Sequence, residues 1–293
     1  ISIAIERRSR ALGIGSVLLV HSLPKMQRHG KPIKAGVKKN NLPSQSFFKN
    51  NGFNYLYEDN EYVYFLWPNA TGPIIIAASH IWDRNALAKF VKQIDRKVII
   101  FQKKDQIEKR RLERLKPAFI FFPHWSWVIP EDIWKNYRRI VFHMTDLPFG
   151  RGGSPLQNLV IRGYVETKIS AVAVNSVVDG GPIYIKYGLS LAGSAQQIYR
   201  RSFRTILHMV EEIAKKNPRP KNQVGKTVLF KRRIHGQSQL PITGTLRKMY
   251  DCIRMLDADG YPHAFLEYGG VVLKFSKAKM HSGEITACVT IQR

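Results

Sequence analysis

Between residues 73 and 143, short apolar runs alternate with polar segments of helical character, and this alternation limits the fold more than any other feature. Strands that alternate with helices at this spacing predict a parallel, doubly wound α/β sheet. The expected strands are 73–79, 97–102, 118–123 and 139–143, and the expected helices are 84–94, 105–115 and 130–137.

His143 closes the fourth of these strands and precedes a loop rich in glycine and proline, "MTDLPFGRGG". Ligands of doubly wound sheets bind at the carboxyl ends of the strands, so His143 is expected on the edge where chemistry is usually done. A tight surface turn is the alternative explanation of the loop. Ser154 and Pro155 then predict a helix start, with the serine as N-cap.

The remaining segments predict three parts joined by two linkers. Strands are expected at 1–5, 31–37 and 62–67, with helices opening after residue 13 and at 44–53. A strand at 167–174, a helix from the Ser194 cap, a helix at 245–258 and short strands over 263–293 complete the pattern. The boundaries expected are 1–67, a linker at 68–72, a main domain at 73–217, a linker at 218–230, and a small C-terminal domain at 231–293.

Composition narrows the class of protein. The 293-residue chain carries a net charge of +26, which suggests acidic partners such as nucleic acid or nucleotides, although the basic residues are spread along the whole chain. Cys252 and Cys288 are far apart and predict neither a disulfide nor a zinc site, which fits a cytoplasmic protein without a metal. The longest apolar stretch is too short to span a bilayer, and no signal peptide is evident, so no membrane partner is expected. The start at Ile1, in a strand-like run, suggests a chain cut from a longer protein.

Two blocks carry a family resemblance: "HMTDLPFGRGGSP" from His143, and "VVDGGP", whose Asp179 lies 36 residues later. They resemble the 10-formyltetrahydrofolate-dependent formyltransferases, which include methionyl-tRNA formyltransferase and the sugar N-formyltransferases. The resemblance runs from about Pro73 to the C-terminus, where "FKRR" and "IRMLDADGYPHAFLEY" are similar to that family's C-terminal domain. It implies a Rossmann-like, mostly parallel sheet.

The resemblance also implies roles for the residues. His143 would hydrogen-bond the oxyanion formed when an amine attacks a formyl carbon, and Asp179 would orient that histidine or accept the amine proton. Without the resemblance, Asp179 is better explained as a turn aspartate before a glycine. On the folate side, the implied residues are His124, Arg151, Gly152 and Gly180.

One position departs from the family pattern. The family's asparagine, two residues before the histidine, is replaced by Val141, which cannot donate to an oxyanion. The loop and the Ser154 helix start could supply a substitute, with Thr145 and Asn158 as the candidate donors. We therefore expect an active enzyme in which Val141→Asn raises the rate only modestly.

The acceptor suggested by the overall pattern is the amine of a nucleotide-linked amino sugar. "PHWSWVIP" and a C-terminal part that looks small for gripping tRNA favour it. The positive charge favours tRNA and hence methionyl-tRNA formyltransferase. Val141 leaves a third alternative, a non-catalytic folate- or nucleotide-binding module. The sugar, the nucleotide and the formation of a homo-oligomer stay open.

The first 67 residues resemble the second half of a GNAT acetyltransferase. Arg10-x-x-Gly13-x-Gly15, followed by Ser16, is similar to that family's acetyl-CoA pyrophosphate loop, and "NLPSQSFFKNNGF" is similar to the block that follows. Asn41 falls where the family's asparagine contacts CoA, and Phe48 replaces a common tyrosine. Because the family's earlier strands are missing, we expect no acetyl transfer.

Overall fold

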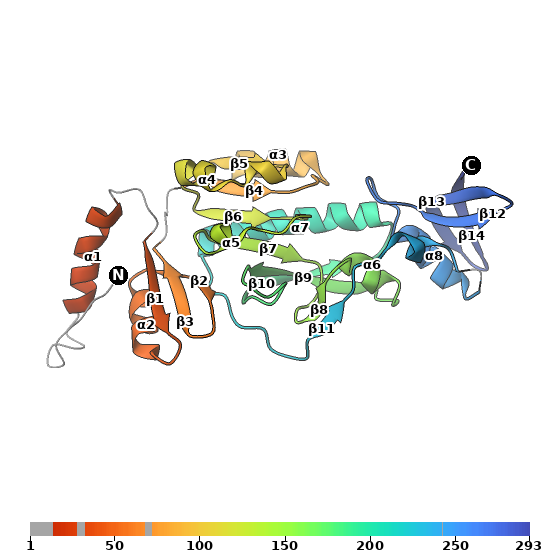
Figure 1. Ribbon diagram of the computed structural model, residues 1–293. Helices are drawn as coiled ribbons and strands as arrows, with labels where there is room; N and C mark the ends of the chain where they lie inside the picture. The colour runs from red at the N-terminus through yellow and green to blue at the C-terminus, as the bar shows by residue number, and fades with distance from the viewer. Residues whose placement is uncertain (1–13, 28–32, 68–71, 242) are drawn as a thin grey trace.

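The computed structural model describes residues 14–27, 33–67, 72–241 and 243–293. Three parts follow one another along an elongated molecule, with the central sheet between two smaller ones (Figure 1). The central part contains β4 (Ile74–Ala77), α3 (Arg84–Gln93), β5 (Val98–Phe101), a 3-10 turn (Lys104–Gln106), α4 (Lys109–Leu115), β6 (Phe119–Phe122), α5 (Glu131–Trp134), β7 (Arg139–His143), β8 (Phe149–Gly152), α6 (Pro155–Val160), β9 (Glu166–Ala173), β10 (Ile183–Ser190) and α7 (Ala195–Lys216).

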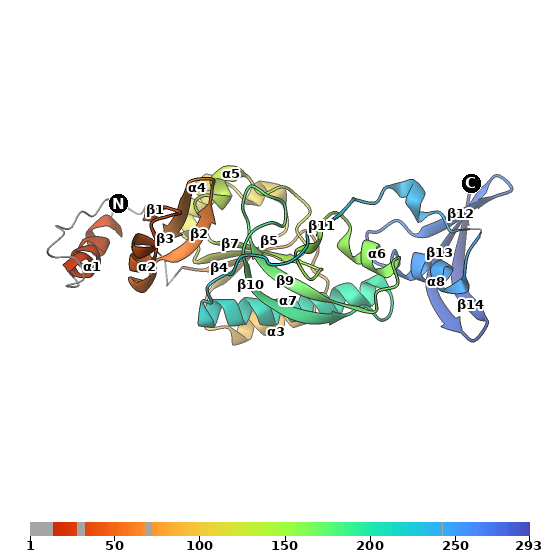
Figure 2. The same cartoon turned by 90° about the horizontal axis from the view of Figure 1, so that it is seen from below.

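The central sheet has the strand order β10-β9-β7-β6-β4-β5. The four strands predicted between residues 73 and 143 are present and parallel. β9 runs antiparallel to β7, and β10 runs antiparallel to β9, so β10 has the direction of the four parallel strands. Helices α3 and α7 lie together on one face, and α4 and α5 lie on the other (Figure 2). The predicted α/β fold with a mostly parallel sheet is confirmed. β10 was not anticipated.

Helix α7 has the N-terminal cap and the apolar face that its sequence predicts. The Ser194 hydroxyl accepts a hydrogen bond from the Gln197 backbone amide, and the Gln197 side chain accepts one from the Ser194 backbone amide. These two bonds form a capping box. The apolar face predicted for this helix is buried, at Ile198, Phe203, Ile206, Leu207, Val210 and Ile213. This face packs on β9 and β10 and fixes the sheet from one side.

One local expectation was confirmed in position but lacks its capping hydrogen bond, and one was wrong. Ser154 does precede α6, but its φ is +49° and its hydroxyl accepts from the Arg233 amide instead of capping the helix. The helix expected over 105–115 is divided at Ile107, which is buried against the sheet, while the Gln106 side chain accepts from the amides of Gln102 and Lys103. A partner distant in the sequence therefore engages the Ser154 hydroxyl, whereas local hydrogen bonds of Gln106 and the burial of Ile107 account for the break before α4.

The N-terminal part consists of α1 (Ile14–Gln27), β1 (Lys34–Lys38), α2 (Leu42–Asn50), β2 (Asn54–Glu58) and β3 (Tyr62–Leu66), with the sheet order β1-β3-β2. It is joined to the central part by buried contacts. Lys34 Nζ donates to Asn136 Oδ1 at 2.8 Å. Tyr57 lies edge-on to Trp134, with 5.3 Å between ring centroids. The expected strand at residues 1–5 lies outside the described residues.

The C-terminal part contains β11 (Val228–Phe230), a 3-10 turn (His235–Ser238), α8 (Leu246–Arg254), β12 (Ala264–Tyr268), β13 (Val271–His281) and β14 (Glu284–Gln292). The last three strands form one antiparallel sheet, β12-β13-β14, and α8 packs on it. β11 pairs in parallel with β8 of the central part. No helix in the described ranges combines the length and the apolar character that crossing a bilayer requires.

Candidate functional site

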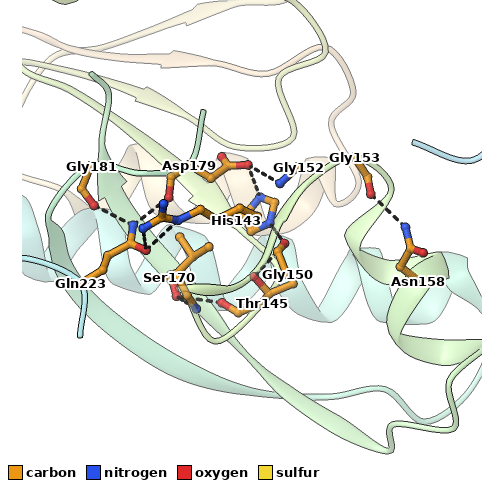
Figure 3. A network of polar contacts seen from close by, with 12 residues as sticks. His143, Thr145, Gly150, Gly152, Gly153, Asn158, Ser170, Asp179, Gly181 and Gln223 are labelled. Atoms are coloured by element: carbon orange, nitrogen blue, oxygen red, sulfur yellow. Dashed lines mark hydrogen bonds and ion pairs between the residues drawn. The ribbon is translucent and has the colours of Figure 1, made fainter. Parts of the chain in front are cut away.

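His143 ends β7 with its side chain 9% exposed, and both ring nitrogens have acceptors nearby. Nε2 lies 2.7 Å from the carbonyl oxygen of Gly150. A carbonyl can only accept, so Nε2 carries a hydrogen. Nδ1 lies 3.4 Å from Oδ2 of Asp179 (Figure 3). The predicted pair is thus brought together at the carboxyl end of the parallel strands.

Asp179 reaches this position from the loop between β9 and β10. Its backbone is in the left-handed region, with φ +51°, and Oδ2 accepts from the Gly152 amide at 3.0 Å. Gly152 itself requires glycine, because its φ is +104° and a Cβ there would lie 2.5 Å from the Phe230 carbonyl oxygen. The carboxylate therefore connects the loop after His143 to the loop before β10.

Gln223 is a residue that the sequence reasoning missed. Its Nε2 donates to the carbonyls of Asp179 and Gly181, at 2.7 and 2.8 Å. Its Oε1 accepts from Nε and Nη2 of Arg151, at 3.1 and 2.7 Å. Arg151, one of the residues expected on the folate side, is therefore connected to the Asp179 loop through Gln223. No local motif marks Gln223, because its partners are distant in the sequence.

The two candidate oxyanion donors are already engaged. Thr145 is fully buried, and its hydroxyl donates to the Gly150 carbonyl at 3.4 Å. The Asn158 amide donates to the carbonyls of Gly153, Ser154 and Lys231, while its Oδ1 accepts from Arg162. Neither side chain has a free hydrogen to offer in this arrangement.

Val141 lies two residues before His143 on β7, so both side chains lie on the same face of the sheet. Val141 is partly exposed and packs at the margin of the apolar cluster beneath α4 and α5. A polar donor at this position would therefore lie on the His143 face.

His124 follows β6 and has φ +49°. Its ring is enclosed by Trp82, Tyr199 and Phe203, and Nε2 lies 3.0 Å from Ser202 Oγ. Burial, with a smaller effect from His80, lowers the pKa of the ring to about 3, so the ring is neutral near pH 7. The His124 ring is therefore packed within an aromatic cluster. Gly180, the other residue expected on the folate side, lies next to Asp179.

The residues expected to bind acetyl-CoA are only partly described. Arg10 and Gly13 lie outside the described residues, whereas Gly15 and Ser16 lie in the first turn of α1. Asn41 caps α2, because its Oδ1 accepts from the Ser44 amide at 3.1 Å. Phe48 is buried in the core of the N-terminal sheet. Asn51 Nδ2 donates to Ser16 Oγ at 3.0 Å, which ties α1 to α2.

A histidine paired with a carboxylate at the edge of a doubly wound sheet is chemically able to transfer a proton to or from a bound reactant. Within the described ranges, no three His, Cys, Asp or Glu residues are grouped so that they could hold a metal ion.

Comparisons with known proteins assign the family. The family described as "Methionyl-tRNA formyltransferase, C-terminal domain" matches residues 235–292. A structure of methionyl-tRNA formyltransferase from Clostridium thermocellum is 44% identical, with a TM-score of 0.73, and the match covers 75% of this chain and 99% of that one. The chain therefore belongs to the formyltransferase family.

More distant relatives set the limits of this assignment. Methionyl-tRNA formyltransferase of Campylobacter fetus is 32% identical over 98 residues, which are 32% of each chain, so the match spans about a third of that curated relative. An N-formyltransferase from Helicobacter canadensis, solved with folinic acid and dTDP-3-aminofucose, is 13% identical with a TM-score of 0.53, over 70% of this chain and 87% of that one. At this identity only the fold is shared.

Proposed function

We propose that the protein transfers a formyl group from 10-formyltetrahydrofolate to the primary amine of a nucleotide-linked amino sugar. The observation that carries the proposal is the contact between His143 and Asp179, 3.4 Å apart, at the carboxyl edge of the sheet. Family membership supports formyl transfer, and the tetrahydrofolate and folinic acid named for distant neighbours support a folate donor.

In the reaction, the amine nitrogen bonds to the formyl carbon, and the bond from that carbon to the folate nitrogen breaks. His143 donates a hydrogen bond to the oxyanion, and Asp179 takes the proton that leaves the amine. Asp179 then passes this proton to the folate nitrogen as it leaves, which balances the reaction. Since both ring nitrogens of His143 already face acceptors, the ring exchanges the Gly150 carbonyl for the oxyanion when substrate binds.

The charge distribution of the C-terminal part supports the sugar acceptor. The described residues between 231 and 293 form a 3-10 turn, helix α8 and one three-stranded sheet. Residues 235–292 match the family described as "Methionyl-tRNA formyltransferase, C-terminal domain", so the fold of this part does not separate the two acceptors. Residues 231–293 have ten Lys and Arg against five Asp and Glu, so the positive charge is no denser here than in the chain as a whole. A charge spread evenly over the molecule is weaker support for a tRNA-binding surface than a concentrated patch would be.

Methionyl-tRNA is the second candidate acceptor. The names of the 44% identical structure and of the curated relatives favour it, and so does the net charge of +26. The two candidates differ in salt dependence, because a complex with tRNA releases counterions and weakens steeply as salt rises.

One experiment separates the alternatives. The chain is incubated with 10-formyltetrahydrofolate and either UDP-, GDP- and dTDP-linked amino sugars or charged initiator tRNA, and products are identified by mass. A gain of one formyl group on a sugar supports the proposal, and formylated methionyl-tRNA overturns it in favour of the second candidate. Folate binding without product from any acceptor would indicate a non-catalytic module.

For residues 1–67 we retain the narrower proposal of an acetyltransferase remnant without turnover. The support is the resemblance together with the Asn41 cap and the Ser16–Asn51 contact that order α1 and α2. Acetylation of any amine by this chain with acetyl-CoA would contradict it, whereas weak CoA binding would not.

A further inference from the structure

Gln223 connects the two loops that meet at His143, and it does so with one side-chain amide. Both amide hydrogens are donated to the Asp179 loop, to the carbonyls on either side of Gly180. The amide oxygen accepts two hydrogen bonds from Arg151, in the loop after His143. Every hydrogen and the oxygen of this side chain are therefore used.

The backbone around Gln223 is fixed on both sides. Lys221 and Ile183 exchange two backbone hydrogen bonds, of 2.7 and 2.8 Å, at the start of β10. Further on, β11 pairs with β8. The segment 218–230 thus forms a strap across the site, and Gln223 lies in it between two anchors.

The strap controls two properties of the site. Asp179 has a left-handed backbone, a conformation that a residue other than glycine holds only when its surroundings enforce it. Two hydrogen bonds from Gln223 hold the backbone carbonyls of Asp179 and Gly181, and the Gly152 amide holds the Asp179 carboxylate. On the other side, Arg151 gives two of its five N–H donors to Gln223, and no hydrogen bond from the other three is found in the described part of the chain.

We propose that Gln223 is a positioning residue that sets both the Asp179 carboxylate and the Arg151 guanidinium for the reaction. The inference rests on the proposed formyl transfer and deepens it. Asp179 then moves protons, and Arg151 presents its remaining donors to an anionic group of a substrate. Gln223 touches neither substrate and acts only through these two residues.

Two near-isosteric variants separate the two halves of this role. Gln223→Glu keeps an acceptor for Arg151 but places a carboxylate oxygen against the Asp179 and Gly181 carbonyls. We therefore expect kcat to fall about 10- to 100-fold, while KM for the folate donor changes by less than about threefold. Gln223→Met loses the hydrogen bonds to the Asp179 loop and those from Arg151. We expect the same fall in kcat together with a higher KM for one substrate. The exposed neighbour provides the control Asn222→Ala, with both constants unchanged.

A second readout does not depend on turnover. Amide hydrogen exchange of the 174–182 loop should speed up in both Gln223 variants and stay unchanged in Asn222→Ala, at equal melting temperatures. Variants with the kinetics and exchange of Asn222→Ala would overturn the role of Gln223. An inactive natural chain would overturn the proposed function instead, and the exchange rates would still decide whether Gln223 holds the loop.

Discussion

The two ends of strand β7 both hold a buried basic side chain, but the protein surrounds them differently. At the carboxyl end, His143 lies beside the carboxylate of Asp179. At the amino end, Arg139 is 1% exposed, and none of its hydrogen-bond partners among the described residues is a carboxylate. Its guanidinium donates to the backbone carbonyls of Leu56, Tyr137 and Val174. It also lies near the aromatic rings of Tyr57 and Trp134.

This difference separates a reactive end from a structural one. A carboxylate can accept a proton and return it, whereas a backbone carbonyl only accepts hydrogen bonds. Burial lowers the pKa of Arg139 to about 10, so this side chain stays charged at neutral pH and serves as a fixed connection. Since Leu56 belongs to β2, that connection joins the N-terminal sheet to the central one.

The largest effect is expected from the reactive end. His143→Asn or Asp179→Asn should lower kcat for formyl transfer by about 1000-fold, because each removes a group that moves or stabilises charge in the reaction. The melting temperature should change little. His281→Gln, at the far end of β13, is the matched histidine control with unchanged activity. Activity within tenfold of the natural chain in either variant would contradict the assigned roles.

The structural end should show the reverse result. Arg139→Met leaves three buried carbonyls without donors, so we expect the free energy of unfolding to fall by about 3 kcal/mol. The folded fraction should keep its kcat within about threefold. Urea denaturation measures the first quantity, and the exposed Arg84→Met on α3 should stay within about 0.5 kcal/mol of the natural chain. A loss of rate without a loss of stability would show that Arg139 belongs to the site.

A smaller effect is expected at Val141. Because Thr145 and Asn158 already use their donors, the structure replaces our expectation of a modest gain with a larger one. Val141→Asn should raise kcat by about 100-fold, the size of a supplied oxyanion contact. Val141→Thr, a near-isosteric change, gives the comparison. Unchanged rates in Val141→Asn would mean that a backbone amide already serves the oxyanion.

The smallest effect concerns pH and sharpens the contrast between the histidines. The pKa of His124 is lowered from 6.5 to about 3, mainly by burial. Between these values the unfolded chain binds this proton more readily than the folded one, so the free energy of unfolding falls with falling pH, by about 2 kcal/mol from pH 7 to pH 5. His124→Asn, which tolerates the left-handed backbone, should lose this part of the pH dependence. The prediction is wrong if urea denaturation shows that His124→Asn and the natural chain lose the same free energy of unfolding between pH 7 and pH 5.

Sequence patterns located the reactive end of β7 better than its surroundings. Four alternating strands and the Ser194 cap are local signals, and they predicted the sheet and α7. The spacing between His143 and Asp179 could be interpreted only through a family resemblance. The pairing of these side chains depends on how β9 returns beside β7, which no local pattern encodes.

Two of the missed features, at Gln223 and Ser154, arise from partners that are distant in the sequence. Gln223 lies in a segment rich in lysine and proline that looks like a linker, and its partners are more than forty residues away. Ser154 has a strong helix-start signal, yet its hydroxyl accepts a hydrogen bond from the distant Arg233 amide instead of capping α6. Strands β2 and β10 are sheet edges that mix polar and apolar residues, and both were missed from the sequence although each contains residues typical of strands.

The strap at 218–230 determines where related proteins can be recombined. A chimera that takes the C-terminal part of another family member and joins it at residue 218 would exchange Gln223 along with that part. The new side chain at this position would have to match an Asp179 loop with which it did not evolve. A crossover after Phe230 leaves the strap with its own loops, so the C-terminal part could be exchanged without disturbing the His143–Asp179 pair.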